Sequence, residues 1–409
     1  MNRTLAITFG SLFLVMLGFS VTLAVLPSRL GRDVPGETLS PDSTAFHVGA
    51  LTGLYALAQF MAAPVWGRWS DRHGRRIALL WSLTGFGASQ VLCGLATSLP
   101  LLYAGRILGG AFSGAMFPIA AGAVADSLPE RLHAQGMAWL SAAAALGVVA
   151  GPILGGLSTR QSWMWDTPFG RIALESFAAP FLALAVMSAL MVAIVLRWRT
   201  DRCTASQRDE RDEGTGWTVV GLRIRGILAL VFVSQVAMAL FMTAFALYAD
   251  ARFRLGPGGI GVAFALCGLI TASVQLGAIW FLARRWGEWM QVGMGFGAMG
   301  VGLAAFPLVP ALGLAAVAVG IFVMGSAIVA PSLLSLSARD TPGAAGTAAG
   351  LVGSATYLGQ VAGPLAASAL FIWDDAAPFY AASVMILPTA AWMLWHRRSS
   401  QNRLKEEKE

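Results

Sequence analysis

Long apolar segments alternate with short polar segments along the whole of this chain. The apolar segments are about 20 residues long, the length that a helix needs to cross the hydrocarbon core of a bilayer. They do not alternate apolar and polar residues with a period of two, so a transmembrane β-barrel is excluded and helices are expected. The pattern predicts twelve membrane spans, at 5–26, 46–66, 77–98, 100–124, 135–157, 174–197, 223–248, 258–282, 290–309, 311–335, 344–372 and 377–395.

The predicted spans divide into two sets of six, separated by a charged stretch. Every side chain from Arg208 to Glu213 is charged, and we interpret this stretch as a solvated connector. The predicted fold class is therefore an all-α integral membrane protein with twelve transmembrane helices in two pseudo-symmetric six-helix bundles. Its parts are an N-terminal bundle, a cytoplasmic linker, a C-terminal bundle and a cytoplasmic tail, at 1–198, 199–222, 223–396 and 397–409, respectively.

The two sets of spans repeat one another in sequence. A glycine-rich stretch in the fifth predicted span matches a stretch in the eleventh at a constant offset of 212 positions. The matching positions include Gly147 with Gly359, Gly151 with Gly363, and Pro152 with Pro364. At offsets of 213 or 214, the chain also pairs Arg72 with Arg285, Gly74 with Gly287, and Asp126 with Asp340. Internal repeats of this kind build many secondary transporters, with the substrate site near the membrane midplane between the repeats.

The composition agrees with a membrane protein, because 56% of the residues are hydrophobic and only 12% are charged, about half the charged share of a soluble domain. The net charge of +7 raises the possibility of a nucleic-acid partner. The basic residues lie in short segments between apolar spans, however, which excludes that class. With the N-terminus inside, 21 of the 28 basic residues fall on the cytoplasmic side and six outside. The positive-inside rule then places both termini in the cytoplasm of a bacterial-type inner-membrane protein.

The cysteines and histidines indicate no metal site, disulfide or cofactor. Cys93, Cys203 and Cys267 are an odd number of thiols without metal-ligand spacing. The four histidines fall at predicted span ends or in loops. An intramembrane enzyme would need a nucleophile, a metal cluster or paired acids within the bilayer, so we do not expect an enzyme.

A segment between the second and third predicted spans reads GRWSDRHGRR, from Gly67 to Arg76. Gly67 would let a neighbouring helix approach closely and Gly74 would allow a tight turn. Asp71 could meet a helix N-terminus and an arginine. The alternative is a basic loop that serves only to set topology. The segment resembles the signature loop of the Major Facilitator Superfamily, which implies a cytoplasmic latch formed by Gly67, Asp71, Arg72, Gly74, Arg75 and Arg76, together with Asp126 at the end of the fourth span.

Arg106 lies inside the fourth predicted span. A charge at the membrane midplane costs at least about 2.5 kcal/mol, so Arg106 is expected to face a cavity or a polar partner. In the family, an arginine at this place is linked to proton coupling, and a purely structural polar contact is the alternative. Asp126 has its own alternative as an ordinary acid at a helix end.

The fifth predicted span resembles the motif that marks exporters within the same superfamily. Glycines four residues apart allow two helices to touch, and a proline bends a helix. The residues that fill the motif are Gly147, Gly151, Pro152, Gly155 and Gly156, and the second-half repeat supplies Gly359, Gly363 and Pro364.

The resemblance covers the whole chain and is nearest to the twelve-span drug:proton antiporters of the tetracycline- and quinolone-exporter type. It implies proton-coupled export of amphipathic small molecules by alternating access. The chain departs from that branch in having no acid inside a predicted span, so proton coupling rests on the resemblance alone. The alternatives are a dedicated exporter of an endogenous metabolite, such as a siderophore or lipid-like compound, and a non-transporting membrane receptor.

Polar and aromatic residues inside the spans are candidates for the substrate cavity, with helix–helix contacts as the alternative for each. The candidates are Tyr55, Gln59, Phe112, Met116, Gln235, Met238, Phe241, Phe245, Gln275, Tyr357 and Gln360. Because Arg106 has no acid beside it in any span, a neutral or anionic amphiphile is the expected substrate. The expected partners are that substrate, protons and the lipid bilayer, and a monomer is expected.

Overall fold

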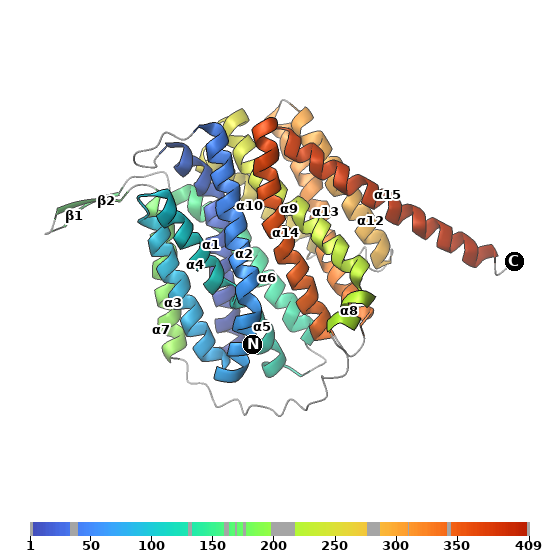
Figure 1. Cartoon of the computed structure of the whole chain (residues 1–409), viewed down its shortest axis with the longest axis horizontal. Coiled ribbons are helices and arrows are strands. Elements are labelled where there is room, and N and C mark those ends of the chain that lie inside the picture. The colour runs from blue at the N-terminus through green and yellow to red at the C-terminus, as the bar shows by residue number, and fades with distance from the viewer. Residues whose placement is uncertain are drawn as a thin grey trace. The chain divides into compact units, whose positions relative to one another are not determined.

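The computed structural model describes residues 3–32, 40–129, 133–158, 163–167, 170–174, 177–197, 217–275, 287–309, 311–341 and 345–406, and most of these residues are helical (Figure 1). Within these ranges, nine helices are long and apolar enough to cross a membrane, and two shorter apolar helices lie at Gly258–Ser273 and Ala377–Met393. This confirms the predicted fold class of an α-helical integral membrane protein. Every predicted span overlaps a helix, which is consistent with the count of twelve.

The described residues of the N-terminal part form seven helices and a hairpin. In chain order these are α1 (Arg3–Arg32), α2 (Pro41–His73), α3 (Arg75–Gly94), α4 (Leu99–Ser113), α5 (Met116–Ser127), α6 (His133–Ser158), β1 (Trp163–Thr167), β2 (Gly170–Leu174) and α7 (Ala178–Arg197). The later elements are α8 (Trp217–Arg223), α9 (Arg225–Phe253), α10 (Pro257–Ser273), α12 (Glu288–Ala305), the 3₁₀ helix η4 (Phe306–Leu308), α13 (Leu312–Arg339), α14 (Ala345–Trp373) and α15 (Ala377–Glu406).

Two compact units divide the chain, and each contains its own packed helices. The first comprises Met1–Arg208 and Ala246–Gly268, and the second comprises Asp209–Phe245 and Leu269–Glu409. In the first unit, α1 packs along α6, α3 packs along α7, and α4 packs against α2 and α3. In the second unit, α12 packs against α13 and α15, and α14 contacts both α13 and α15.

Glycines bring helices into backbone contact within each unit, as the repeated motif predicts. A Cβ added at Gly151 on α6 would lie 2.5 Å from the Leu17 carbonyl oxygen of α1. A Cβ added at Gly363 on α14 would lie 2.8 Å from the Val236 carbonyl oxygen of α9. Both distances are too short for any side chain. The two helix pairs can approach this closely because both residues are glycines, which have no side chain.

Several element boundaries differ from the sequence prediction, among them the following three. Residues 67–73, predicted as a loop, form the last turns of α2, and only Gly74 separates α2 from α3. The fourth span is two helices, α4 and α5, which meet at Gly114 and Ala115. The sixth span begins at Ala178 rather than at residue 174.

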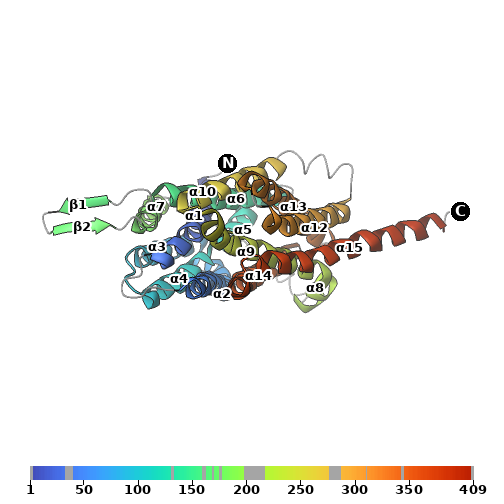
Figure 2. The same cartoon turned by 90° about the horizontal axis from the view of Figure 1, so that it is seen from above.

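An unpredicted antiparallel hairpin precedes α7. β1 pairs with β2 in a register that places Trp163 opposite Leu174 and Trp165 opposite Ile172. Bulky apolar side chains of this kind favour extended backbone. Figure 2 shows the hairpin extending away from α7, the helix that follows it in the chain.

Candidate functional site

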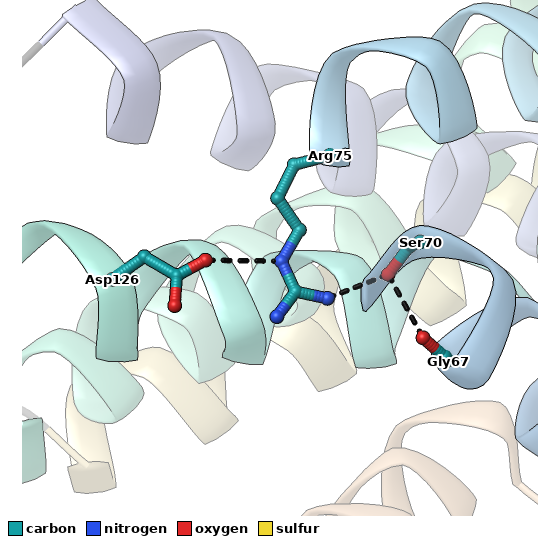
Figure 3. A network of polar contacts seen from close by, with 4 residues as sticks. All are labelled: Gly67, Ser70, Arg75 and Asp126. Atoms are coloured by element: carbon teal, nitrogen blue, oxygen red, sulfur yellow. Dashed lines mark hydrogen bonds and ion pairs between the residues drawn. The ribbon is translucent and has the colours of Figure 1, made fainter. Parts of the chain in front are cut away.

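A polar cluster joins the junction of α2 and α3 to the end of α5 in the first unit (Figure 3). The Arg75 Nε donates to Asp126 Oδ2 at 3.1 Å, and one Arg75 terminal nitrogen donates to Ser70 Oγ at 2.5 Å. Ser70 Oγ in turn donates to the Gly67 carbonyl oxygen at 3.1 Å. The charged pair is partly exposed, with 17% of the Arg75 side chain and 40% of the Asp126 side chain accessible. The cluster therefore ties three helices together by directed polar contacts at one end of the bundle.

Two glycines make this geometry attainable. Gly74 has a φ of +93°, a conformation that L side chains rarely adopt. The prediction of a tight turn at Gly74 is thereby confirmed, and the turn brings Arg75 to the first position of α3. On α5, a Cβ at Gly122 would overlap the Arg75 guanidinium. Ser70 and Gly122 both escaped the sequence analysis, because their roles depend on contacts between distant helices.

The other residues of the predicted latch have different environments. Arg76 donates from Nε to the Val195 carbonyl oxygen at 3.1 Å and from Nη2 to the Leu196 carbonyl oxygen at 2.7 Å. It therefore caps the C-terminus of α7, where a cation is favourable. Arg72 is exposed. The Asp71 side chain lies outside the described residues, so its part in the latch stays a prediction.

Gly67 has room beside it in this structure, so its part in a close helix approach stays a prediction. A Cβ added at Gly67 would lie 3.6 Å from Pro118 Cβ, which is an ordinary van der Waals contact. An alanine would fit there, because the α2–α5 contact is looser at this level than the sequence suggests.

Arg106 lies buried between α1, α2 and α4. Only 3% of the residue is exposed. Its Nη1 donates to Thr22 Oγ1 at 3.2 Å, and its guanidinium carbon lies 4.1 Å from the centroid of the Tyr55 ring. The Thr22 hydroxyl donates to the Gly18 carbonyl oxygen, so a lone pair of that hydroxyl faces Arg106. Among the described residues, Arg106 is the one charged side chain in the buried set, and its Nε and Nη2 have no hydrogen-bond acceptor there.

Small residues on α4 hold Tyr55 beneath Arg106. A Cβ at Gly109 would lie 3.3 Å from the Tyr55 ring, and a Cβ at Gly110 would overlap the Tyr55 carbonyl oxygen. The centroid of the Tyr55 ring also lies 5.5 Å from that of the Phe19 ring. The sequence predicts Arg106 and Tyr55 as separate candidates. Nothing in it indicates Thr22 or the stacking of Arg106 on Tyr55.

The exporter motif on α6 lies against α1. A Cβ at Gly147 would lie 2.8 Å from Met16 Cβ, and the Gly147 carbonyl oxygen accepts a hydrogen bond from Ser20 at 3.3 Å. Gly155 continues the contact, because a Cβ there would lie 3.1 Å from a Val25 methyl carbon. α6 continues through Pro152 and Gly156 as one helix, but the surroundings of these two residues lie outside what the structure describes.

The cavity candidates of the first unit lie on α2, α4 and α5. Tyr55, Gln59 and Met116 are buried, and Phe112 is half-buried. The Phe112 ring lies 5.9 Å from the Trp66 ring, and a Cβ at Gly85 would overlap it. The cavity role of these four residues stays a prediction.

The cavity candidates of the second unit divide into two groups. Phe241 and Phe245 are buried in an aromatic cluster, with Phe241 4.4 Å from Phe322 and Phe245 5.7 Å from Phe306. This favours the alternative that both are helix–helix contacts. The half-buried residues are Gln235, Met238, Tyr357 and Gln360, and Gln275 is exposed near the end of its described segment. Their cavity role is likewise still a prediction.

Within the described ranges, no group of three or more His, Cys, Asp or Glu residues could hold a metal ion. The two arrangements described above are one buried guanidinium and a polar cluster at a helix junction. Neither arrangement contains a nucleophile paired with a base.

Comparison with known proteins places this architecture in context. The family model of the Major Facilitator Superfamily matches residues 8–364. The class C tetracycline resistance protein of Escherichia coli is 30% identical, over 98% of this chain and 99% of its own length. Multidrug resistance protein 1 of Bacillus subtilis (strain 168) is 27% identical, over 96% of each chain. The structure of a bacterial homologue of the human lysosomal transporter Spinster, in an inward-facing, unoccupied conformation, has a TM-score of 0.75 and 15% identity, over 97% of this chain and 98% of that one.

Proposed function

Because this chain belongs to the Major Facilitator Superfamily, we propose that it exports amphipathic small molecules by alternating access, driven by protons. The proposal is supported by relatives of full length that are named tetracycline and multidrug resistance proteins. A dedicated exporter of an endogenous metabolite is the second candidate. The exporter motif on α6 favours outward transport in both cases.

The observation that carries the proposal is the environment of Arg106. A desolvated guanidinium is costly, and it is retained in membrane helices where it has a functional partner. Thr22 and Tyr55 satisfy one nitrogen and one face of the guanidinium, and Nε and Nη2 are left without an acceptor in the described part of the chain. We assign to Arg106 the role of responding to the charge of the substrate or to a proton exchanged during the cycle.

The cytoplasmic latch is the second part of the proposal. In it, Arg75, Asp126 and Ser70 fix the junction of α2 and α3 against α5, and Asp71, Arg72, Gly74 and Arg76 complete the latch. The basic residues concentrate in the segments assigned to the cytoplasm, which supports an inner-membrane location with both termini inside.

Substrate charge gives a direct test of the proposal. A permanent cation near Arg106 would experience repulsion in a medium of low effective dielectric constant, and this costs several kcal/mol at contact distances. We therefore expect the protein to export a neutral or anionic amphiphile at least about tenfold faster than a quaternary cation such as ethidium. The measurement is efflux of the two compounds, side by side, from cells that express equal amounts of the protein. Equal efflux of both compounds, with the ratio unchanged in Arg106→Gln, would refute the charge assignment, and no efflux of either would count against drug export.

A further inference from the structure

The second unit contains a cluster at the positions that correspond to the Arg75 cluster. An offset of 213 positions takes Gly74 to Gly287, Arg75 to Glu288, Gly122 to Ser335 and Asp126 to Arg339. Glu288 is the first residue of α12, as Arg75 is the first residue of α3. Arg339 is the last residue of α13, and Asp126 lies in the last turn of α5. At this offset Asp126 corresponds to Arg339, one residue before the Asp340 with which the sequence comparison at 214 positions pairs it.

The contacts of the second cluster resemble those of the first with the charges exchanged. Glu288 Oε1 accepts a hydrogen bond from Ser335 Oγ at 2.5 Å, and Glu288 Oε2 lies 3.9 Å from Arg339 Nη1. Farther along the same α12–α13 contact, Ser332 Oγ donates to Gln291 Oε1 at 3.1 Å in a buried position. α12 and α13 are thus joined by two polar contacts in succession, with the charged pair at the end.

The residue that lies beside the first charged side chain, Gly122 in one unit and Ser335 in the other, differs with the sign of that charge. In the first unit the arginine is the first residue of α3, and Gly122 on α5 leaves space for its broad guanidinium. In the second unit the acid is the first residue of α12, and Ser335 on α13 supplies a hydroxyl donor to its carboxylate. A guanidinium carries no acceptor and a carboxylate carries no donor, so each intermediate residue suits the charge that it meets. The three positions form one matched set in each unit.

Helix dipoles make the two clusters unequal in strength. An acid is favoured at a helix N-terminus and a base at a C-terminus. Glu288 and Arg339 each lie at the favourable end of their own helix, whereas Arg75 and Asp126 each lie at the unfavourable end. If each pair were separated, the helix dipoles would disfavour the charges of Arg75 and Asp126 but would favour those of Glu288 and Arg339. The first pair depends on its partner more strongly, which agrees with its shorter separation of 3.1 Å against 3.9 Å.

We propose that Glu288, Ser335 and Arg339 are positioning residues of the second unit, a charge-exchanged counterpart of Arg75, Gly122 and Asp126 that fixes the end of α12 against the end of α13. The inference rests on the proposed transport function for its activity readout. It goes beyond that function, because it assigns a second positioning cluster of opposite polarity that the signature segment does not contain.

Exchange of charges tests this assignment. Glu288→Arg places two arginines together and should lower the maximal rate of drug efflux about three- to tenfold at equal membrane abundance, with the half-saturating concentration nearly unchanged. The triple variant Glu288→Arg/Ser335→Gly/Arg339→Glu recreates the chemistry of the first unit. It should return efflux to within about twofold of wild type. Asp375→Arg is the matched control, because it reverses one exposed charge outside both clusters and should leave efflux unchanged.

Thermal unfolding of the same purified variants in detergent supplies a readout that needs no substrate. The melting temperature should fall in Glu288→Arg and recover in part in the triple variant, because its exchanged charges attract each other but lie at the unfavourable ends of their helices. A triple variant that is no better than Glu288→Arg in melting temperature, or in efflux at equal abundance, would overturn the inference. Failure of the wild-type protein to move any drug would instead count against the proposed function, and the melting temperatures would still decide the assignment.

Discussion

Arg106→Met should abolish drug efflux while leaving the protein in the membrane and at least as stable to heat as wild type. The two effects separate because methionine retains most of the apolar volume of arginine and removes an incompletely paired charge. Replacement of buried ionic groups by apolar residues of similar size is often neutral or stabilising by about 1–4 kcal/mol. Loss of the guanidinium removes the group to which we assign the charge response, so efflux should fall by about two orders of magnitude. The measurement pairs efflux with thermal unfolding of the purified protein.

Two further substitutions show which property of Arg106 matters. Arg106→Lys keeps the charge but loses the planar group that lies on the Tyr55 ring and reaches Thr22, so it should remain strongly impaired. Tyr55→Phe keeps an aromatic ring beneath the guanidinium and should be mild, whereas Tyr55→Leu should be severe. Normal efflux in Arg106→Met would reduce the residue to a structural contact. A large loss of stability in that variant would point to the same conclusion.

Alanine at Gly363 should destabilise the second unit and abolish export, whereas alanine at Gly353 of the same helix should be harmless. A Cβ at Gly363 would lie 2.8 Å from two backbone atoms of α9, at Val236 and Leu240, and these atoms cannot move aside as a flexible side chain can. Overpacking of this kind costs about 1–3 kcal/mol. Gly353 has no heavy atom within 4 Å of an added Cβ, and alanine favours a helix over glycine by about 1 kcal/mol.

The corresponding experiment in the first unit uses Gly151. An added Cβ there would lie 2.5 Å from the Leu17 carbonyl oxygen and 2.8 Å from the Val21 nitrogen of α1. Gly151→Ala and Gly363→Ala should both lower the melting temperature and the amount of protein in the membrane, and Gly353→Ala should lower neither. Equal behaviour of all three variants would show that the glycines do not set the distance between the helices.

The sequence predicted the helices well, because a helix that crosses lipid must be apolar and must satisfy its own backbone. The same criterion placed the end of α2 too early, because it follows apolar residues and not the helix itself. The charged residues from Arg68 to Arg72 end the apolar run, but nothing in them breaks a helix before Gly74, where φ is positive. The hairpin was missed because its two five-residue strands lie between predicted spans and were treated as loop.

The sequence predicted those parts of the candidate sites that a single residue or a local motif makes recognisable. Arg106 is conspicuous in an apolar span, and the signature segment is conspicuous by its spacing. Thr22 and Gly122 are small residues whose roles appear only when another helix is placed against them. Glu288 and Arg339 lie outside the predicted spans, and their pairing depends on the packing of α12 against α13.

The measurement that tests the central claim most directly is transport by the purified protein in liposomes with an imposed pH gradient. Vesicles with an acidic interior are given an external neutral drug, and accumulation is followed with and without a protonophore. We predict uptake that requires the gradient, stops with the protonophore, and is absent in vesicles that contain Arg106→Met. Uptake that is equally fast without a gradient, or a gradient that leaves the drug outside in every vesicle preparation, would contradict proton-driven export.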